Sequence, residues 1–310
     1  QWLHAENHLL GENSQSLPSV LRRRPTLADA VMEGLLGGAG RARKRILVTG
    51  GEGMLGAALL EQATLHFPAW EVKALARREL DVRDPLALMS WREWIEGGWI
   101  IHCAAMVNVE ACAREPELGR ATIVDGTRNV VALAKASGAR LFFPQSFLVF
   151  DGATDPIPEN ETPRPLSLYG ALKSEAETLI VSSMDNPLIV RMAGFFGGES
   201  RDKNFVGAII PRMRALVEAG IGTLEVGDRV WQPTWTRDLA TNALALISAD
   251  ARGIYHMASH GSAAFYEIAE EIVASLGWTG SLRIVRNPAL AIDGDDLTRR
   301  PPRAVLSCDK

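Results

Sequence analysis

A tyrosine and a lysine four residues apart, Tyr169 and Lys173, form the pair in this sequence best suited to acid–base chemistry. On a helix, residues at this spacing project from one face. A phenol has an ordinary pKa of about 10, and a nearby ammonium stabilises the phenolate and lowers that pKa. Such a pair can donate a proton to a carbonyl oxygen, although surface helices also carry this spacing by chance. The expected helix has an apolar stripe at Ala171, Leu172, Ala176, Leu179 and Ile180.

A glycine-rich turn upstream has the form of a dinucleotide-binding loop. The buried-type strand at residues 46–49 leads into Gly50-Gly51-Glu52-Gly53-Met54-Leu55-Gly56, and an apolar helical run follows. A strand, a glycine turn and a helix in this order place backbone N–H groups and the positive helix end against a pyrophosphate. We therefore predict that the cofactor is bound at Gly50, Gly53, Met54, Leu55 and Gly56.

The segment after the next predicted strand, residues 71–76, bears on the choice of cofactor. NAD sites usually place an acid about 20 residues past the glycines, where it binds the ribose 2′-hydroxyl. This sequence has Arg77 and Arg78 in that neighbourhood, and two guanidinium groups suit the 2′-phosphate of NADPH. We therefore expect NADPH in preference to NADH. Asp81 and Val82 resemble a further short strand, with the acid placed for the adenine.

Strands and helices alternate through this part of the chain. Residues 99–102 resemble a strand that ends in the small-residue turn Cys103-Ala104-Ala105, which we expect beneath the nicotinamide ribose. Residues 121–138 resemble a helix, and residues 140–144 a strand that ends at Gln145-Ser146. This alternation predicts an α/β fold with a parallel, doubly wound, Rossmann-like sheet. Ligands bind beyond the carboxyl ends of such strands, so Ser146 should meet Tyr169 across the cofactor.

Composition and charge limit the classes of function. The chain has 310 residues, of which 47% are hydrophobic and 23% charged, and a formal net charge of −4. This balance favours neither nucleic acid nor an anionic membrane as a partner. No apolar run approaches the ~20 residues of a transmembrane helix. The three cysteines, Cys103, Cys112 and Cys308, have no metal-binding spacing, so we expect reduced thiols, a cytoplasmic location and no metal.

The chain divides into three parts. Residues 1–44 resemble a partly flexible N-terminal extension with basic clusters, and a short helix is predicted at residues 26–33. A dinucleotide-binding Rossmann domain is expected over residues 45–190, and residues 234–250 are expected to return to it as a helix. The strand–helix rhythm loosens elsewhere, so residues 191–233 and 251–310 are assigned to a smaller substrate-binding portion.

Several segments together resemble the extended short-chain dehydrogenase/reductases and, among these, the dTDP-4-dehydrorhamnose reductase family. The matching segments include ILVTGGEGMLG, HCAAMVNVEACAREPE, PENETPRPLSLYGALKSEAE, LIVRMAGFFG, DRVWQPTWTRDLA and RRPPRAVLSCDK. The resemblance extends from Lys44 to Lys310 and implies that the chain continues further. It implies a catalytic set of Ser146, Tyr169 and Lys173, and reduction of a keto group on a nucleotide-activated deoxysugar. A homodimer is left open.

Candidate contacts with the sugar nucleotide lie mostly in the smaller portion: Arg191, Asn204, Phe205, Arg229, Trp231, Gln232 and Arg303. Phe147 is a further candidate, next to the expected catalytic serine. The family typically reads STDYVF where this chain has residues 145–150, so Phe147 and Leu148 replace an acid and a tyrosine. Burying unpaired sugar hydroxyls against apolar side chains is costly. We therefore expect a substrate that is deoxygenated, or presents an apolar edge, at this point.

Two alternatives use the same fold. A nucleotide-sugar epimerase or dehydratase would share the scaffold and the catalytic set, although a dehydratase usually needs an acidic pair near the serine. A non-catalytic subunit, similar to the methionine adenosyltransferase regulatory subunit, would bind the dinucleotide and a protein partner without turnover. Turnover of NADPH with a panel of nucleotide-linked keto-sugars distinguishes these possibilities.

Overall fold

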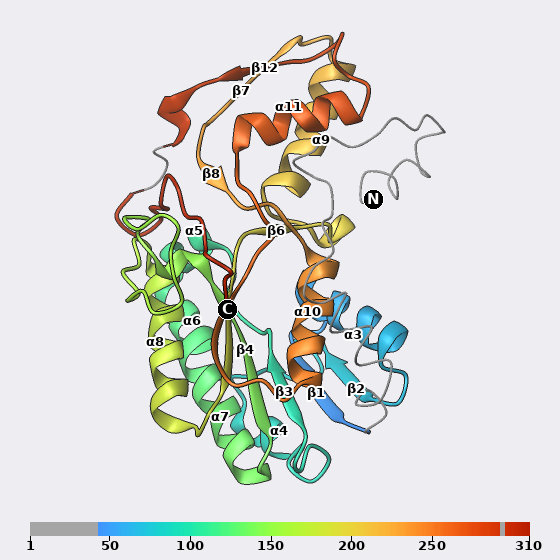
Figure 1. Cartoon of the computed structure of the whole chain (residues 1–310), viewed down its shortest axis with the longest axis vertical. Helices are drawn as coiled ribbons and strands as arrows, with labels where there is room; N and C mark the ends of the chain where they lie inside the picture. The colour runs from blue at the N-terminus through green and yellow to red at the C-terminus, as the bar shows by residue number, and fades with distance from the viewer. Residues whose placement is uncertain (1–42, 292–294) are drawn as a thin grey trace.

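A sheet of six parallel strands forms the centre of the computed structural model, which describes residues 43–291 and 295–310. The strands lie in the order β10-β5-β4-β3-β1-β2 (Figure 1). They are β1 (Arg45–Thr49), β2 (Glu71–Leu75), β3 (Trp99–His102), β4 (Arg140–Ser146), β5 (Leu188–Met192) and β10 (Gly253–Met257). The order reverses at β1, and a crevice for ligands forms at such a point. The predicted extension lies outside the described residues, except for residues 43 and 44.

Helices cover both faces of the sheet (Figure 1). The helices α3 (Met54–His66) and α10 (Thr236–Ser248) pack together on one face, and α7 (Gly126–Ser137) and α8 (Leu168–Ser183) pack on the other. Shorter elements are α4 (Pro85–Met89), α5 (Val109–Arg114), α6 (Pro116–Arg120), the π-helical turn η3 (Ala121–Asp125) and the 3-10 turn η4 (Phe147–Val149). The helix predicted over residues 121–138 is therefore divided into η3 and α7.

Alternating side chains of the strands build two apolar cores, because successive residues of a strand point to opposite faces. Leu47 and Ile100 pack with the α7 and α8 side, whereas Val48 and Ile101 pack with the α3 and α10 side. Each of these four side chains is 0% exposed. Full burial of such an aliphatic side chain contributes about 1.5–3 kcal/mol. The sheet is thus a stable base for the loops at its carboxyl edge.

Two predicted features differ from the structure. Asp81 and Val82 lie in a turn and not in a strand, because the Asp81 carboxylate accepts the backbone N–H of Arg83 at 3.0 Å and closes the chain locally. Trp99–His102 is therefore the third strand along the chain and not the fourth. Residues 253–257, which we assigned to the substrate-binding portion, form β10 and pair in parallel with β5.

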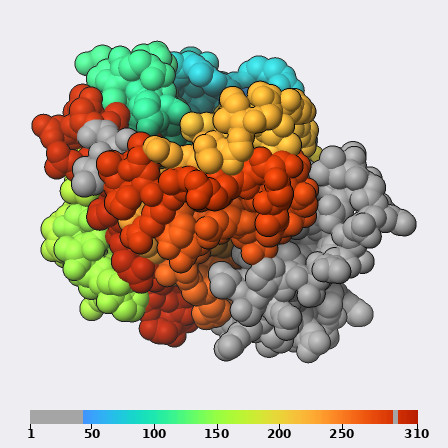
Figure 2. Space-filling model, turned by 90° about the horizontal axis from the view of Figure 1, so that it is seen from above, coloured from blue at the N-terminus to red at the C-terminus, as the bar shows by residue number. Residues whose placement is uncertain are grey.

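A smaller part of the molecule lies above the carboxyl edge of the sheet (Figure 1). Its elements are β6 (Phe195–Phe196), η5 (Glu199–Arg201), α9 (Phe205–Glu218), β7 (Thr223–Val226), β8 (Val230–Trp231), β9 (Thr234–Trp235), β11 (Ala263–Ala264), α11 (Phe265–Ser275), β12 (Arg283–Arg286) and η6 (Pro288–Ala291). The pairs β7·β12, β8·β11 and β6·β9 form small sheets. Seen from above in Figure 2, the yellow-to-red segments of this part lie across the middle of the face turned to the viewer. None of the described helices combines the length and apolar character needed to cross a bilayer.

The side chain of Arg191 lies inside the core and is only 3% exposed, in contrast to the predicted substrate contact. Its Nη2 lies 2.5 Å from Oε1 of Glu177, and its Nη1 donates to the backbone oxygen of Glu159 at 2.9 Å. Gln145, the cross-strand neighbour of Arg191, also donates to the Glu177 carboxylate at 2.9 Å. Arg191 therefore stabilises a buried carboxylate, because a buried charge needs a partner.

Replacing Arg191 by Met should lower the free energy of unfolding by about 3–5 kcal/mol, because it leaves the Glu177 carboxylate buried and unpaired. Urea denaturation measures this loss. The matched control combines Arg191→Met with Glu177→Met, which removes both charges and should restore most of the stability. An Arg191→Met protein as stable as the wild type would contradict the structural role of this arginine.

Candidate active site

Ser146, Tyr169 and Lys173 come together at the carboxyl end of β4. Ser146 is the last residue of that strand, and the other two lie in the first two turns of α8. The helix begins after Ser167, whose hydroxyl accepts the N–H of Gly170 at 3.1 Å and so caps the helix. The Ser146 side chain acts to lower the pKa of Tyr169, so the two side chains are neighbours. A strand end and a helix start therefore bring a hydroxyl and a phenol together.

Gly170 determines how closely α8 approaches η4. A Cβ at this position would lie 2.3 Å from the backbone oxygen of Leu148, so any other residue would force the two elements apart. The N–H of the same Leu148 donates to the Ser146 hydroxyl at 3.1 Å. The turn η4 thus holds the serine in place while the glycine brings in the helix that carries the tyrosine.

Burial dominates the protonation of the two ionisable side chains. Burial raises the pKa of Tyr169 to about 12, and the Ser146 side chain acts in the opposite direction. Burial lowers the pKa of Lys173 to about 7, and Glu177 is among the groups that act to raise it. Lys173 Nζ donates to the backbone oxygen of Pro144 at 2.9 Å. The predicted lowering of the Tyr169 pKa is therefore wrong, because burial destabilises the phenolate more than the neighbouring Ser146 stabilises it.

The glycine loop leaves the start of α3 open. Helix α3 begins at Met54 directly after Gly53, and no side chain caps its N-terminal N–H groups. A Cβ at Gly56 would lie 2.4 Å from the backbone oxygen of Gly50, whereas a Cβ at Gly53 would meet only that same oxygen, at 3.2 Å. Gly56 therefore closes the loop on the protein itself. Gly53 faces open space at a helix N-terminus, which suits an approaching phosphate.

A buried chain of hydrogen bonds holds the turn Cys103-Ala104-Ala105 against this loop. The Thr49 hydroxyl accepts the N–H of Ala104 at 3.2 Å and lies 2.9 Å from Nδ1 of His102. Nε2 of His102 lies 3.1 Å from the Thr127 hydroxyl, and burial lowers the pKa of His102 to about 3. The imidazole is therefore neutral and connects the ends of β1 and β3 to α7. A Cβ at Gly50, which has a φ of +70°, would lie 2.8 Å from the Ala104 nitrogen.

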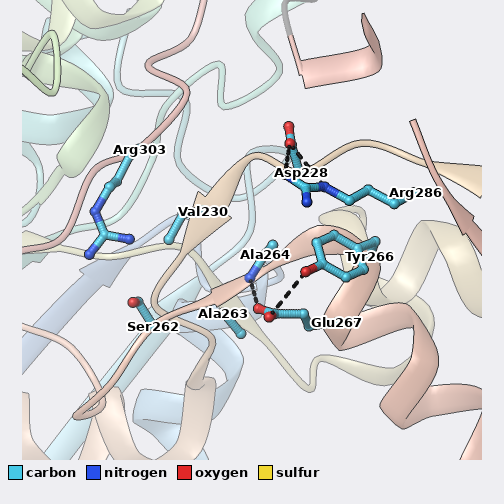
Figure 3. Close-up of a pocket in the computed structure, with 9 residues that line it drawn as sticks. All are labelled: Asp228, Val230, Ser262, Ala263, Ala264, Tyr266, Glu267, Arg286 and Arg303. Atoms are coloured by element: carbon cyan, nitrogen blue, oxygen red, sulfur yellow. Dashed lines mark hydrogen bonds and ion pairs between the residues drawn. The ribbon is translucent and has the colours of Figure 1, made fainter. Parts of the chain in front are cut away.

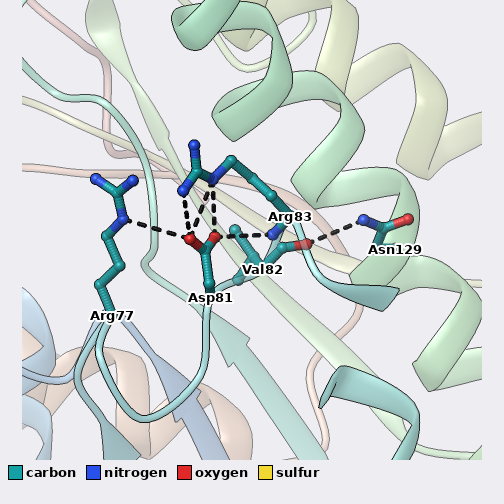
Figure 4. A network of polar contacts seen from close by, with 5 residues as sticks. All are labelled: Arg77, Asp81, Val82, Arg83 and Asn129. Atoms are coloured by element: carbon teal, nitrogen blue, oxygen red, sulfur yellow. Dashed lines mark hydrogen bonds and ion pairs between the residues drawn. The ribbon is translucent and has the colours of Figure 1, made fainter. Parts of the chain in front are cut away.

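Arg77 and Arg78 extend from the turn after β2 toward solvent. Arg78 Nη1 lies 3.2 Å from Oε2 of Glu52, in the glycine loop, and Arg77 Nε lies 3.5 Å from Oδ2 of Asp81. Arg83 contacts the Asp81 carboxylate more closely, with Nη2 at 2.5 Å, and its hydrogen bond lowers the pKa of Asp81 (Figure 4). Asp81 thus already has partners where we predicted an adenine contact. The exposed arginines border the glycine loop.

Two other predicted cofactor residues have mostly buried surroundings. Val82 is 2% exposed, and its backbone oxygen accepts Nδ2 of Asn129 at 3.0 Å. Burial raises the pKa of the Cys103 thiol to about 12. All three cysteines are free. Within residues 43–291 and 295–310, no three His, Cys, Asp or Glu side chains gather as metal ligands would.

Three of the predicted substrate residues lie around an aromatic cluster above the loop. Asn204 donates to the backbone oxygen of Phe195 at 2.7 Å and lies 3.9 Å from the Met54 sulfur. The ring of Phe205 stacks on Phe265 at 4.0 Å between centroids, and Trp231 meets Phe205 edge-on at 6.5 Å. Asn204 therefore lies between the aromatic cluster and the start of α3.

Gln232 and Arg303 have protein partners in place of the predicted substrate contacts. Nε2 of Gln232 donates to the backbone oxygen of Leu306 at 3.1 Å, and its Oε1 accepts the N–H of Leu306 at 2.7 Å. Gln232 is 3% exposed and so fixes the C-terminal segment. Arg303 Nε lies 2.6 Å from the Asp155 carboxylate, and this ion pair is partly exposed. Phe147, the remaining candidate, packs against two hydrophobic clusters.

A cavity of about 290 Å³ lies beside β8, β11 and the start of α11 (Figure 3). Its lining consists of Asp228, Val230, Ser262, Ala263, Ala264, Tyr266, Glu267, Arg286 and Arg303. Asp228 pairs with Arg286 at 2.7 Å, and Glu267 accepts the N–H of Ala264 at 2.7 Å. Val230 and Trp231 are adjacent in β8 and point to opposite faces. The cavity and the aromatic cluster therefore lie on opposite sides of that strand.

Four residues that shape the site were not among the predicted site residues: Gly51, His102, Gln145 and Gly170. A Cβ at Gly51 would lie 2.5 Å from the backbone of Ala74, so this glycine packs the loop against β2. The sequence does indicate Gly170, because glycine is unfavourable inside a helix and its place directly after the tyrosine points to a close packing contact. The partners of Gln145 and His102 lie far along the chain, and no local pattern indicates them.

A parallel sheet with a glycine loop after β1 and a Ser–Tyr–Lys set after β4 defines the class of the short-chain dehydrogenase/reductases. The family model described as RmlD substrate binding domain matches residues 44–310, and the chain belongs to this family.

Individual relatives and structures agree with this assignment. The chain is 34% identical to dTDP-4-keto-6-deoxy-D-glucose reductase of Streptomyces niveus, over 86% of this chain and 89% of the relative. It is 27% identical to methionine adenosyltransferase 2 subunit beta of Xenopus laevis, over 86% of this chain and 81% of the relative. The structure of dTDP-4-dehydrorhamnose reductase from Bacillus anthracis in complex with NADP superposes with a TM-score of 0.76 at 24% identity. That match covers 86% of this chain and 92% of that one. The predicted fold and family are confirmed.

Two glycines of the loop provide a matched test. Gly53→Ala should leave the fold intact and weaken NADPH binding about tenfold or more, a loss of about 1.4 kcal/mol or greater, because its methyl group enters the open space at the helix start. Gly56→Ala should destabilise the protein, because its methyl group meets a backbone oxygen. Thermal unfolding and fluorescence titration with NADPH separate the two effects. An unchanged NADPH affinity in Gly53→Ala would exclude the predicted phosphate site.

Proposed function

We propose that this chain is an NADPH-dependent reductase of a keto group on a nucleotide-activated deoxysugar. The observation that carries the proposal is the placement of Ser146 and Tyr169 together at the carboxyl end of β4, with Lys173 one turn further along α8. Relatives that are named as reductases of dTDP-linked keto-sugars align with most of this chain. They support an oxidoreductase acting on a sugar nucleotide.

The residues around the crevice fit a dinucleotide. Gly53 and the uncapped start of α3 would hold the pyrophosphate, and the Ala104 turn would lie beneath the nicotinamide ribose. Arg77 and Arg78 would hold the 2′-phosphate, because both are exposed and each has, among the described residues, one carboxylate partner that a phosphate can displace. When bound, the nicotinamide supplies the hydride.

Tyr169 donates the proton in this mechanism. A pKa of about 12 keeps the phenol protonated at neutral pH, so the proton is available when an alkoxide develops on the substrate. In the ligand-free protein, the Ser146 side chain acts to lower the pKa of Tyr169. Once the substrate is bound, the single O–H of Ser146 would donate to the substrate carbonyl oxygen instead. Lys173, with a pKa of about 7, lies where it can bind the ribose hydroxyls and supply positive charge.

The smaller part of the molecule would hold the sugar nucleotide, with Asn204, Phe205 and Trp231 on the side of the glycine loop. Phe147 and Leu148 follow the catalytic serine directly. We propose that the substrate turns a deoxygenated or apolar edge toward them, because they offer no side-chain hydrogen bond to a sugar hydroxyl. The division into a Rossmann domain and a substrate-binding portion, a homodimer and a cytoplasmic location all stay predictions.

A non-catalytic subunit is the second candidate, favoured by the similarity to methionine adenosyltransferase 2 subunit beta. Such a protein would bind NADPH without reducing any keto-sugar. An epimerase or dehydratase would convert its substrate without net consumption of NADPH. The comparison of binding with turnover therefore separates all three.

Tyr169→Phe removes only the proton donor. With a dTDP-linked 4-keto-6-deoxysugar, NADPH oxidation should fall by about 10²–10⁴-fold in kcat, because general acid catalysis contributes about that much. NADPH affinity and thermal stability should stay close to those of the wild type. Near-normal turnover in this variant would rule out the role of Tyr169. Tight NADPH binding with no turnover of any keto-sugar by the wild type would favour the non-catalytic subunit.

The double variant Arg77→Ala with Arg78→Ala tests the choice of cofactor. Each charge-assisted hydrogen bond to a phosphate contributes about 1.5–3 kcal/mol. NADPH should therefore bind at least about tenfold more weakly, whereas NADH affinity should change little. Titration with both cofactors measures the difference, and Arg92→Ala serves as the charge control, since Arg92 is an exposed arginine after α4 whose Nε donates to the backbone oxygen of Ala136. Equal losses for NADPH and NADH would show that the pair does not contact the 2′-phosphate.

A further inference from the structure

Gln145 is a buried residue directly before Ser146 that takes no part in the chemistry above. It is 3% exposed. Its Oε1 accepts the backbone N–H of Ser146 at 2.8 Å, and its Nε2 donates to the backbone oxygen of Lys173 at 2.9 Å. One amide therefore joins the end of β4 to the second turn of α8. These are the two elements that carry the catalytic set.

Glu177 and Arg191 hold this amide in one orientation. Nε2 of Gln145 also donates to Oε2 of Glu177 at 2.9 Å, and Arg191 contacts both oxygens of the same carboxylate. The three residues are 3%, 6% and 3% exposed, in the order Gln145, Glu177 and Arg191. Turning the amide over would place its oxygen against the carboxylate and the Lys173 oxygen, which are acceptors only. The low exposure makes such a mismatch costly.

We propose that Gln145 is a positioning residue for the reduction, which sets the distance between the Ser146 hydroxyl and the Tyr169 phenol. This inference rests on the proposed function. Gln145 contacts the backbone of Ser146 and of Lys173, and not their side chains. Its loss would therefore shift the two elements without removing a group that meets the substrate. A displacement of about 1 Å between catalytic groups can lower a rate about 10²-fold.

Gln145→Met keeps the length of the side chain and removes its three hydrogen bonds. We expect kcat with a dTDP-linked 4-keto-6-deoxysugar to fall about 10–100-fold, with the Kd for NADPH within about twofold of the wild type. A role limited to stability would not produce this split. A wild-type kcat in Gln145→Met would overturn the inference.

Gln62→Met is the matched control on the opposite face of the sheet. Gln62 is 6% exposed, and its Oε1 accepts the Thr241 hydroxyl at 3.1 Å and lies 3.2 Å from His66 Nε2. Its replacement also removes hydrogen bonds of a buried glutamine, one to α10 and one within α3. The Gln62→Met protein should be less stable than the wild type and should have the same kcat. An equal loss of kcat in Gln62→Met would overturn the inference.

Should Gln145→Met fail to fold, the triple variant with Gln145→Met, Glu177→Met and Arg191→Met takes its place, since it removes the buried ion pair as a whole. It is compared with the double variant Glu177→Met with Arg191→Met, which shares the loss of Glu177 near Lys173. A kcat below that of the double variant supports the inference, and an equal kcat overturns it. A crystal structure of Gln145→Met tests the same point without substrate. A longer distance between the Ser146 and Tyr169 oxygens supports the positioning role, and an unchanged distance overturns it. If the wild type reduces no keto-sugar, the proposed function fails and this distance still decides the role of Gln145.

Discussion

The arrangement of the proposed catalytic set depends on one close approach, that of the Gly170 backbone to the carbonyl oxygen of Leu148. Because this glycine has no Cβ, the first turn of α8 can rest directly on η4, and the Tyr169 phenol reaches the Ser146 hydroxyl. The same approach places Lys173 against the sheet, where its Nζ donates to the backbone oxygen of Pro144 at 2.9 Å. A larger residue at position 170 would lift both functional groups together.

The burial of Lys173 and Tyr169 that results costs free energy, and it also shifts their pKa values. Lys173 is 4% exposed and lies 3.9 Å from the centroid of the Phe143 ring, so its charged form loses hydration without gaining a full counter-ion. Its pKa falls to about 7 and that of Tyr169 rises to about 12. The apolar layers on both faces of the sheet offset this cost. Tyr169 thus stays protonated at neutral pH, whereas Lys173 can exchange between its charged and neutral forms there.

Short-range signals explain which parts of the structure could be predicted. A strand, a glycine turn and a helix occupy neighbouring residues, and the spacing of Tyr169 and Lys173 is fixed by one helix, so both features were predictable. The protein partners of Arg191 and Gln232 were not predictable, because they lie 14 residues away at Glu177 and 74 residues away at Leu306. The type of a polar residue does not indicate whether it faces solvent or a buried partner. Only the fold decides that.

Phe147 packs both with the core of the smaller part and with the cluster around Val149 and Phe150, and it follows Ser146 directly. The benzyl side chain therefore connects the apolar packing around α9 and α11 with the packing around η4. A substitution that reshapes the core of the smaller part would thus also act on the residue next to Ser146, which lies far from that core in the sequence.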